Sequence, residues 1–170
     1  MSKEINLEDL KIQDPPEVIR TLPAYWSCVQ IKRLKDNAII PTQGSVAAAG
    51  YDAYACLDHD VEILPGKNAK IGTGIAVSIP EVTWLGIFAR SGLATKEGLR
   101  PANCVGVVDA DYRGEIIVAI YNDSLEAKII HPGDRIAQLI LLPKFNWYIE
   151  EVEDLDDTDR GAGGFGSTGK

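Results

Sequence analysis

The chain has 170 residues, of which 45% are hydrophobic and 25% are charged, an ordinary composition for one globular domain. Its net charge is −8 at pH 7, and it carries no basic stripe of the kind that duplex-binding proteins use. We therefore expect no polymeric nucleic acid as a partner. A single phosphorylated molecule stays compatible, because it needs only a few arginines and backbone N–H groups.

The reactive side chains exclude several kinds of chemistry. Cys28, Cys56 and Cys104 are far apart and show no C-x-x-C spacing, which disfavours a disulfide framework or a zinc site and fits a reducing compartment. His59 and His131 read as ordinary surface residues, so Ser-His and Cys-His catalysis is not expected. We see no signal peptide or membrane-length apolar run, and expect a soluble, intracellular protein, cytoplasmic or nuclear, with no membrane partner.

The segment 1–22 differs in texture from the rest of the chain. A short helix near its start would end at Pro15-Pro16. We expect a poorly ordered extension, with a segment that docks on a partner as the alternative. The chain is accordingly divided into this extension, a β-domain over 23–153 and a C-terminal arm over 154–170.

From Trp26 onward, short apolar runs alternate with turn residues such as Pro65-Gly66, Asn122-Asp123 and Pro132-Gly133. This pattern predicts an all-β sandwich or barrel with few long helices. The predicted strands are 29–34, 39–40, 61–63, 75–79, 84–89, 116–121, 127–130 and 135–142.

One short helix is predicted over 91–96, just after the strand that ends at Ala89. Ser91 is a good N-cap residue, so a capped turn with no further role explains the segment well. The alternative is a phosphate site, in which helix N–H groups, Arg90 and the Ser91 hydroxyl bind phosphate oxygens.

The segment Gly106–Gly114 is the strongest candidate for catalysis. Asp109 and Asp111 stand at alternate positions, which in a strand would place both carboxylates on one face. Acidic residues in a surface turn are an equally good interpretation. Asp109, however, follows Gly106-Val107-Val108, which read as a buried strand, and a carboxylate at the end of such a strand is placed to orient or deprotonate a water. Tyr112 could pack against a sugar and exclude a 2′-hydroxyl by steric clash.

The tail 160–169 is rich in glycine, and a flexible terminus is its simplest interpretation. Other features favour a function. Arg160, Ser167, Thr168 and successive Gly N–H groups can bind phosphate, and Phe165 is a large apolar group with no use in a free tail. Together they predict a phosphate clamp with an aromatic lid that excludes water.

Taken together, these segments resemble the five motifs of the trimeric dUTP diphosphatases, in the order of that family and over roughly residues 26–170. The motifs are Ala49-Gly50-Tyr51-Asp52, Arg90-Ser91-Gly92-Leu93-Ala94, Gly106-Val107-Val108-Asp109-Ala110-Asp111-Tyr112-Arg113-Gly114, Pro132-Gly133-Asp134-Arg135-Ile136-Ala137-Gln138-Leu139 and Arg160-Gly161-Ala162-Gly163-Gly164-Phe165-Gly166-Ser167-Thr168-Gly169.

The resemblance implies a distorted β-jelly-roll subunit of a homotrimer, with active sites shared at the subunit interfaces and closed by a mobile Gly-rich arm. It implies Mg²⁺-dependent hydrolysis of dUTP to dUMP and pyrophosphate. This reaction lowers dUTP and supplies dUMP for thymidylate synthesis.

The resemblance also implies roles for individual residues. Asp109 would hold the attacking water, and Asp52 would lie near Mg²⁺ through water, the metal being held mainly by substrate phosphates. Asn103 would contact uracil, Arg160 the γ-phosphate, and Phe165 would cover the uracil. The full set of substrate-binding positions is Arg90, Ser91, Gly92, Asn103, Gly106, Val107, Val108, Asp111, Tyr112, Ile117, Gln138, Arg160, Phe165, Gly166, Ser167 and Thr168.

Two other functions stay open at this point. A dCTP deaminase of the same fold needs an acid/base group at the base, and the nearest candidate, Glu115, reads as poorly placed beyond the Arg113-Gly114 turn. A nucleotide-gated binding module is the second alternative, with the segment 1–22 as its docking element.

Overall fold

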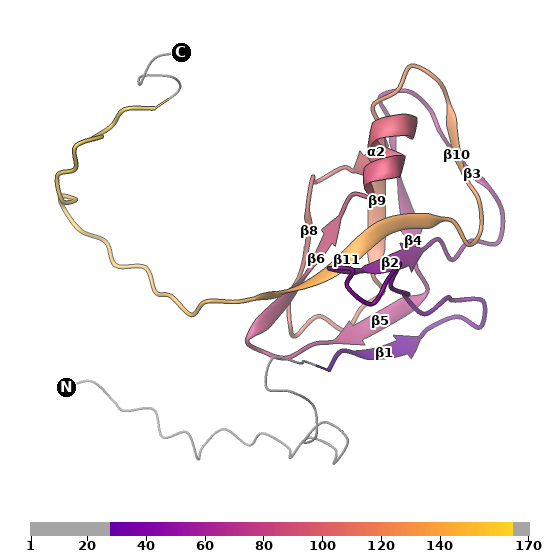
Figure 1. Cartoon of the computed structure of the whole chain (residues 1–170), viewed down its shortest axis with the longest axis horizontal. Coiled ribbons are helices and arrows are strands. Elements are labelled where there is room, and N and C mark those ends of the chain that lie inside the picture. Colours follow the sequence, from indigo (N-terminus) through magenta and orange to yellow (C-terminus); the bar gives the residue numbers. More distant parts are fainter. Residues whose placement is uncertain (1–27, 165–170) are drawn as a thin grey trace.

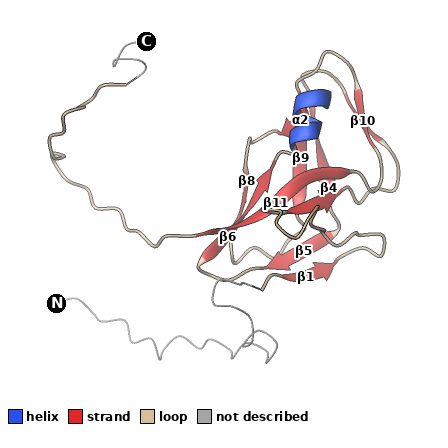
Figure 2. Cartoon of the chain, in the orientation of Figure 1, coloured by secondary structure: helices blue, strands red, loops and turns tan. Residues whose placement is uncertain are grey.

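A computed structural model describes residues 28–164. The described residues form strands and one short helix (Figures 1 and 2), which confirms the all-β prediction. In chain order they are β1 (Gln30–Arg33), β2 (Tyr51–Tyr54), β3 (Val61–Ile63), β4 (Asn68–Gly72), β5 (Ile75–Ser78), β6 (Thr83–Phe88), α2 (Ser91–Glu97), β7 (Leu99–Pro101), β8 (Gly106–Val108), β9 (Ile117–Asn122), β10 (Lys128–Ile130) and β11 (Arg135–Pro143).

The strands pair into small antiparallel sheets. The largest has the order β2-β11-β6-β8, and a second has the order β4-β9-β7. Two pairs, β1-β5 and β10-β3, complete the body. Inward-facing aliphatic residues of these sheets form one core, which includes Ile63, Ile71, Ile75, Leu85, Ile87, Val118, Ile120, Ile130, Ile136 and Leu139.

Three strands were not predicted, and one prediction was wrong. Residues 39–40 precede Pro41 without forming a strand. The strands β2, β4 and β7 lack a strong apolar pattern and owe their conformation to pairing with β11 and β9. Pro101 is tolerated because β7 lies at the edge of its sheet, where a missing N–H costs little.

The predicted short helix exists, but Ser91 does not cap it. The residue at the N-cap position is Arg90, with extended backbone and no capping hydrogen bond from its side chain. Ser91 is the first helical residue instead. The helix ends at Glu97, and the Gly98 that follows has a φ of 69°, a left-handed conformation that glycine adopts at little cost. The Ser91 hydroxyl is therefore not committed to a capping role.

Beyond β11 the chain leaves the body and runs out into solvent (Figure 1). This segment exposes large apolar side chains, including 78% of Trp147 and 84% of Tyr148. Exposure of these apolar side chains to water is unfavourable, and apolar surfaces of this kind usually mark an interaction site. No helix in the described part of the chain is long and apolar enough to cross a membrane.

Asn122 is a buried polar residue that joins two parts of the fold. Its Nδ2 donates to the carbonyl oxygens of Ile63 and Glu126, both at 2.8 Å. Its Oδ1 accepts from Ser124 N at 2.9 Å and Ser124 Oγ at 2.7 Å. All hydrogen-bonding positions of the amide are thus used inside the protein, which is the condition for burying it without loss.

We expect Asn122→Ala to lower the free energy of unfolding by about 3 kcal/mol. The substitution removes these hydrogen bonds and leaves their buried partners without one. Urea denaturation at one fixed protein concentration measures the loss. Asn68→Ala, at an exposed position of β4, is the matched control and should change stability little. Equal effects of the two substitutions would contradict the structural role of Asn122.

Candidate active site

A small cavity of about 220 Å³ opens beside β8 and the start of β9. Seven of the residues predicted from the sequence to act on substrate line it: Asn103, Gly106, Val107, Val108, Asp109, Tyr112 and Ile117. Ile87, Glu115 and Ile116 complete the lining. A single stretch of chain, 103–117, therefore builds almost the whole pocket.

Asp109 is the exposed acidic residue among those that line this cavity. Strand β8 ends at Val108, so the expectation that Asp109 and Asp111 share one face of a strand is wrong. Asp109 instead begins a turn, in which Tyr112 N donates to the Asp109 carbonyl oxygen at 3.2 Å. The strand before it is not wholly buried either, since Val107 is 64% exposed. The carboxylate is exposed, and no described residue donates a hydrogen bond to it. It is thus available to hold a water.

Tyr112 is held in place by two neighbours in the same loop. Its hydroxyl donates to the Glu115 carbonyl oxygen at 3.1 Å. Its ring lies so close to Gly114 that any Cβ there would overlap the phenol. Arg113 braces the loop by donating from Nη1 to the carbonyl oxygens of Ala110 at 2.6 Å and Tyr112 at 2.9 Å. The ring therefore has a defined position at the cavity.

A second cluster is centred on Asp52, which is only 5% exposed. Its Oδ1 accepts from Arg90 Nε at 3.0 Å, and its Oδ2 accepts from Arg135 Nη1 at 3.2 Å. Gln138 lies directly opposite Asp52 in the β2-β11 pair. The single negative charge of the buried carboxylate is shared by both guanidinium groups and fixes their positions, while both arginines keep part of their surface in solvent.

Local irregularities of the backbone make this cluster possible. The pairing register between β11 and β2 shifts between Arg135 and Ala137, which is the signature of a β-bulge. Ile136 and Ala137 are consequently both buried, although neighbouring residues of a regular strand face opposite sides. Gly50 permits the close approach of β2, since a Cβ there would lie 2.6 Å from the Leu139 carbonyl oxygen.

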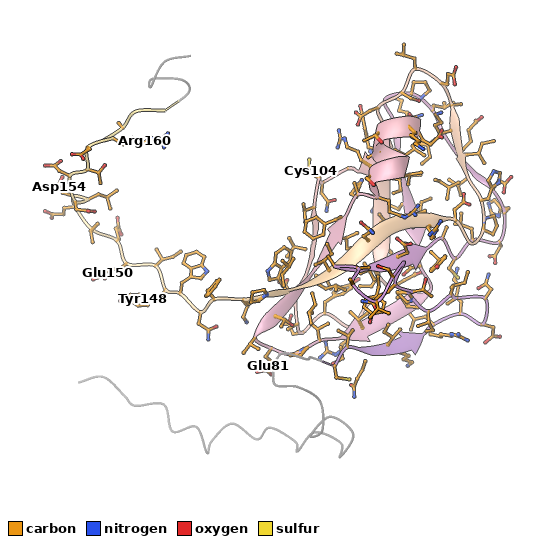
Figure 3. The ribbon with its side chains drawn as sticks, in the orientation of Figure 1. Glu81, Cys104, Tyr148, Glu150, Asp154 and Arg160 are labelled. Carbon is orange, nitrogen blue, oxygen red and sulfur yellow. The ribbon has the colours of Figure 1, made fainter. Side chains whose placement is uncertain are left out.

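The structure does not bring all predicted residues together in one chain. Asp52, Arg90 and Gln138 do not line the cavity at Asp109. Ser91 and Gly92 are exposed at the start of α2. Arg160 lies far out on the segment that leaves the body (Figure 3), and its Nε donates to the Gly163 carbonyl oxygen at 2.8 Å. Phe165, Gly166, Ser167 and Thr168 lie outside the described residues.

Sequence reasoning missed two residues that the structure places at these sites. Arg135 was read as part of a motif, without the role of second cation on Asp52 that the structure gives it. Glu115 was considered only as an acid/base group for deamination, and its place in the cavity lining, with its Oε1 accepting from Gly74 N at 2.7 Å, was not predicted. Adjacency to the motifs was the available signal in both cases.

The remaining reactive groups serve other contacts. Asp60 accepts a hydrogen bond from His131 Nδ1 at 2.8 Å and raises the pKa of that imidazole. Burial raises the pKa of the Cys56 thiol, which donates to Asn37 Oδ1 at 3.1 Å. The described cysteines are free thiols. Neither His131 nor Cys56 lines the cavity. The exposed carboxylate of Asp109, beside the ring of Tyr112, is therefore the reactive group of this pocket.

Comparison with known proteins agrees with this chemistry. The dUTPase family model matches residues 36–169. The deoxyuridine 5′-triphosphate nucleotidohydrolase of Desulfitobacterium hafniense is 49% identical over 137 residues, covering 79% of this chain and 91% of that protein. The enzyme of the same name from Syntrophotalea carbinolica is 45% identical over 141 residues, covering 83% and 96% of the two chains.

Solved structures agree as well. A mutant dUTPase of Staphylococcus bacteriophage 80alpha with dUpNHpp superposes with a TM-score of 0.76 at 30% identity, covering 84% of this chain and 99% of that one. A mutant dUTPase of the S. aureus phage phi11, described with a structural Mg(II) ion, has a TM-score of 0.69 at 26% identity, covering 76% and 99%. With its fold, its cavity and its relatives in agreement, the chain belongs to the dUTPase family and is a dUTP diphosphatase, which hydrolyses dUTP to dUMP.

Proposed function

We propose that Asp109 orients and deprotonates the water that attacks dUTP. The observation that carries this role is that Asp109 lines the cavity, is exposed, and accepts no hydrogen bond at its carboxylate from a described residue. A general base must reach its water directly, and a carboxylate already paired with an arginine, such as Asp52, is less suited to that task. Asp109 would deliver the water, and the products would be dUMP and pyrophosphate.

The cavity would bind the nucleoside. Asn103 and the backbone of Gly106, Val107 and Val108 would contact uracil, with Ile117 at its far wall. Tyr112 would stack on deoxyribose, and its fixed ring would clash with a 2′-hydroxyl. Selection of the deoxy sugar by shape needs no charge, which suits an exposed aromatic ring in an acidic protein. Asp111, exposed on the same turn, would contribute at the rim.

The Asp52 cluster and the start of α2 would bind the triphosphate. Arg90 is already oriented by Asp52, so little side-chain entropy is lost when it meets a phosphate oxygen. Ser91, Gly92 and Gln138 would add hydrogen bonds. From the C-terminal arm, Arg160, Phe165, Gly166, Ser167 and Thr168 would close over the nucleotide.

Mg²⁺ would accompany the triphosphate. Among the described residues no three His, Cys, Asp or Glu side chains are grouped to hold a metal. Both Asp52 oxygens accept from guanidinium groups, so this residue fits contact through water rather than direct ligation. This donor set fits Mg²⁺ held mainly by phosphate oxygens and waters, which the ion prefers. When bound, the ion would neutralise phosphate charge during bond cleavage.

We further propose a homotrimer in which active sites are shared, inside the cell and in the cytoplasm or nucleus. The cavity of about 220 Å³ is smaller than usual ligand pockets and holds no arginine, while the arginine cluster lies elsewhere. An apolar groove of about 570 Å³, lined by β1, β5, β6 and β11, stands beside the root of the exposed segment. Contact between this groove and a neighbour's apolar segment would bury both surfaces. That segment includes Phe145, Trp147, Tyr148 and Ile149.

Asp109→Asn should lower turnover of dUTP by roughly 10²- to 10⁴-fold, because an amide cannot accept the proton of water. The dissociation constant of a non-hydrolysable dUTP analogue should change little, since the side chain faces the water. Pyrophosphate release measures the first quantity and calorimetry the second. Asp58→Asn, outside both sites, is the matched control. Turnover close to that of the unchanged enzyme would remove Asp109 from this role.

Chelation of Mg²⁺ with EDTA should lower turnover of dUTP by roughly 10- to 100-fold, because the phosphate charge is then no longer neutralised. Addition of excess Mg²⁺ should restore it fully. Circular dichroism should be the same in both states, since the described protein residues form no metal cage. Undiminished pyrophosphate release in EDTA would contradict the Mg²⁺ proposal.

Two inactive variants, Asp109→Asn and Arg90→Ala, should complement each other when they are mixed under conditions that exchange subunits. If one chain supplies the cavity and its neighbour supplies Arg90, random assembly leaves about a quarter of the sites intact. Pyrophosphate release from the mixture measures the recovery, with each variant alone as control. A mixture as inactive as its components would show that one chain supplies both groups.

A further inference from the structure

Glu115 lies between the cavity and a turn of the neighbouring sheet. It is half-buried and follows Gly114 directly, just before β9 begins. Its Oε1 accepts from Gly74 N at 2.7 Å, in the turn that joins β4 to β5. A Cβ on Gly72 would come within 2.5 Å of the same oxygen. The absence of a side chain at Gly72 therefore leaves the space that the Glu115 carboxylate occupies.

The same turn grips the residue that follows Glu115. Thr73, which is buried, donates to the Ile116 carbonyl oxygen from its backbone N at 3.1 Å and from its Oγ1 at 2.6 Å. Ile116 N in turn donates to the Ile75 carbonyl oxygen at 2.9 Å. Backbone and side chain of 115–116 are thus tied to one rigid turn.

The sugar-facing residue is attached to this anchored backbone. The Tyr112 hydroxyl donates to the Glu115 carbonyl oxygen at 3.1 Å, and the ring packs against Gly114. Any rotation of the peptide at Glu115 would move the acceptor of that hydroxyl. The orientation of the ring therefore depends on how this backbone is held, by the hydrogen bonds of Ile116 and by the contact between Glu115 and Gly74.

We propose that Glu115 is a positioning residue for sugar selection: its contact with Gly74 holds its own carbonyl oxygen, and thereby Tyr112, in the orientation that excludes a 2′-hydroxyl. This inference rests on the proposed role of Tyr112 as the sugar gate. Glu115 acts through Tyr112 and needs no contact with substrate. What the contact requires is an acceptor oxygen at the right reach, because its partner is a neutral backbone N–H.

Two conservative substitutions separate reach from charge. Glu115→Gln keeps the length and the acceptor oxygen but removes the charge. Glu115→Asp keeps the charge but is one methylene too short to meet Gly74 N. The test is to measure kcat and KM of each variant for dUTP and for UTP, with the full chain and in the presence of Mg²⁺. Glu81→Ala, an exposed position in the turn before β6 (Figure 3), is the control.

Glu115→Gln should keep the ratio of kcat/KM for dUTP over that for UTP. Glu115→Asp should lower this ratio roughly fivefold, the size expected for losing one hydrogen bond that holds the ring in place. The change for dUTP should lie in KM more than in kcat, because Asp109 is untouched. Tyr112→Phe, which removes the hydroxyl, should lower the ratio similarly, and its effect should not add to that of Glu115→Asp.

Other outcomes overturn the proposal. Selectivity lost in Glu115→Gln but kept in Glu115→Asp would mean that the charge acts on substrate. Loss in both would mean a general packing defect, and loss in neither would mean that Glu115 has no part in selection. Tyr112→Ala distinguishes this failure from that of the gate itself. If it relaxes selectivity while Glu115→Asp does not, only the role of Glu115 falls, whereas unchanged selectivity removes Tyr112 as the gate.

Discussion

Strand β11 is hydrogen-bonded on both edges, to β2 on one side and β6 on the other, and most of the functional geometry depends on it. Its bulge at Ile136 turns Arg135 toward Asp52 while keeping two successive apolar residues in the core. The sheet continues through β6 to β8, and Asp109 is the residue that follows β8 in the chain. One doubly paired strand thus joins the arginine cluster and Asp109, the proposed catalytic carboxylate, in a single sheet.

An acidic protein that acts on a tetra-anionic nucleotide needs local solutions to charge. Asp52 provides one, because its buried carboxylate holds two guanidinium groups whose outer surfaces stay exposed. The arginines are pre-organised, and the carboxylate between them reduces their mutual repulsion. The net charge of −8 is spread over the chain, so salt screens its repulsion of a distant anion. Salt screens the attraction between an anion and two adjacent arginines much less.

In contrast to the Asp52 cluster, the cavity is lined by no cationic side chain among the described residues. Its lining consists of Gly106, aliphatic residues, the ring of Tyr112 and the polar residues Asn103, Asp109 and Glu115. In the proposed site such a surface would discriminate by shape, and the discrimination would depend on how stiff the loop that presents it is. The ties of 112–116 to the turn 72–74 supply that stiffness from a different sheet.

The sequence by itself determined the all-β class, the short helix and the stretch that builds the cavity. These features are local: apolar alternation reports strands, and residues 103–117 form one continuous piece of the pocket. Tertiary structure alone decided the partners of Asp52, which come from 38 and 83 positions away, and the seat of Glu115 on a turn 41 positions distant. It also decided β2, β4 and β7, and the end of β8 before Asp109. The physical reason is that strand register and bulges are set by pairing between distant segments, whereas a pattern along the chain reports only its own period.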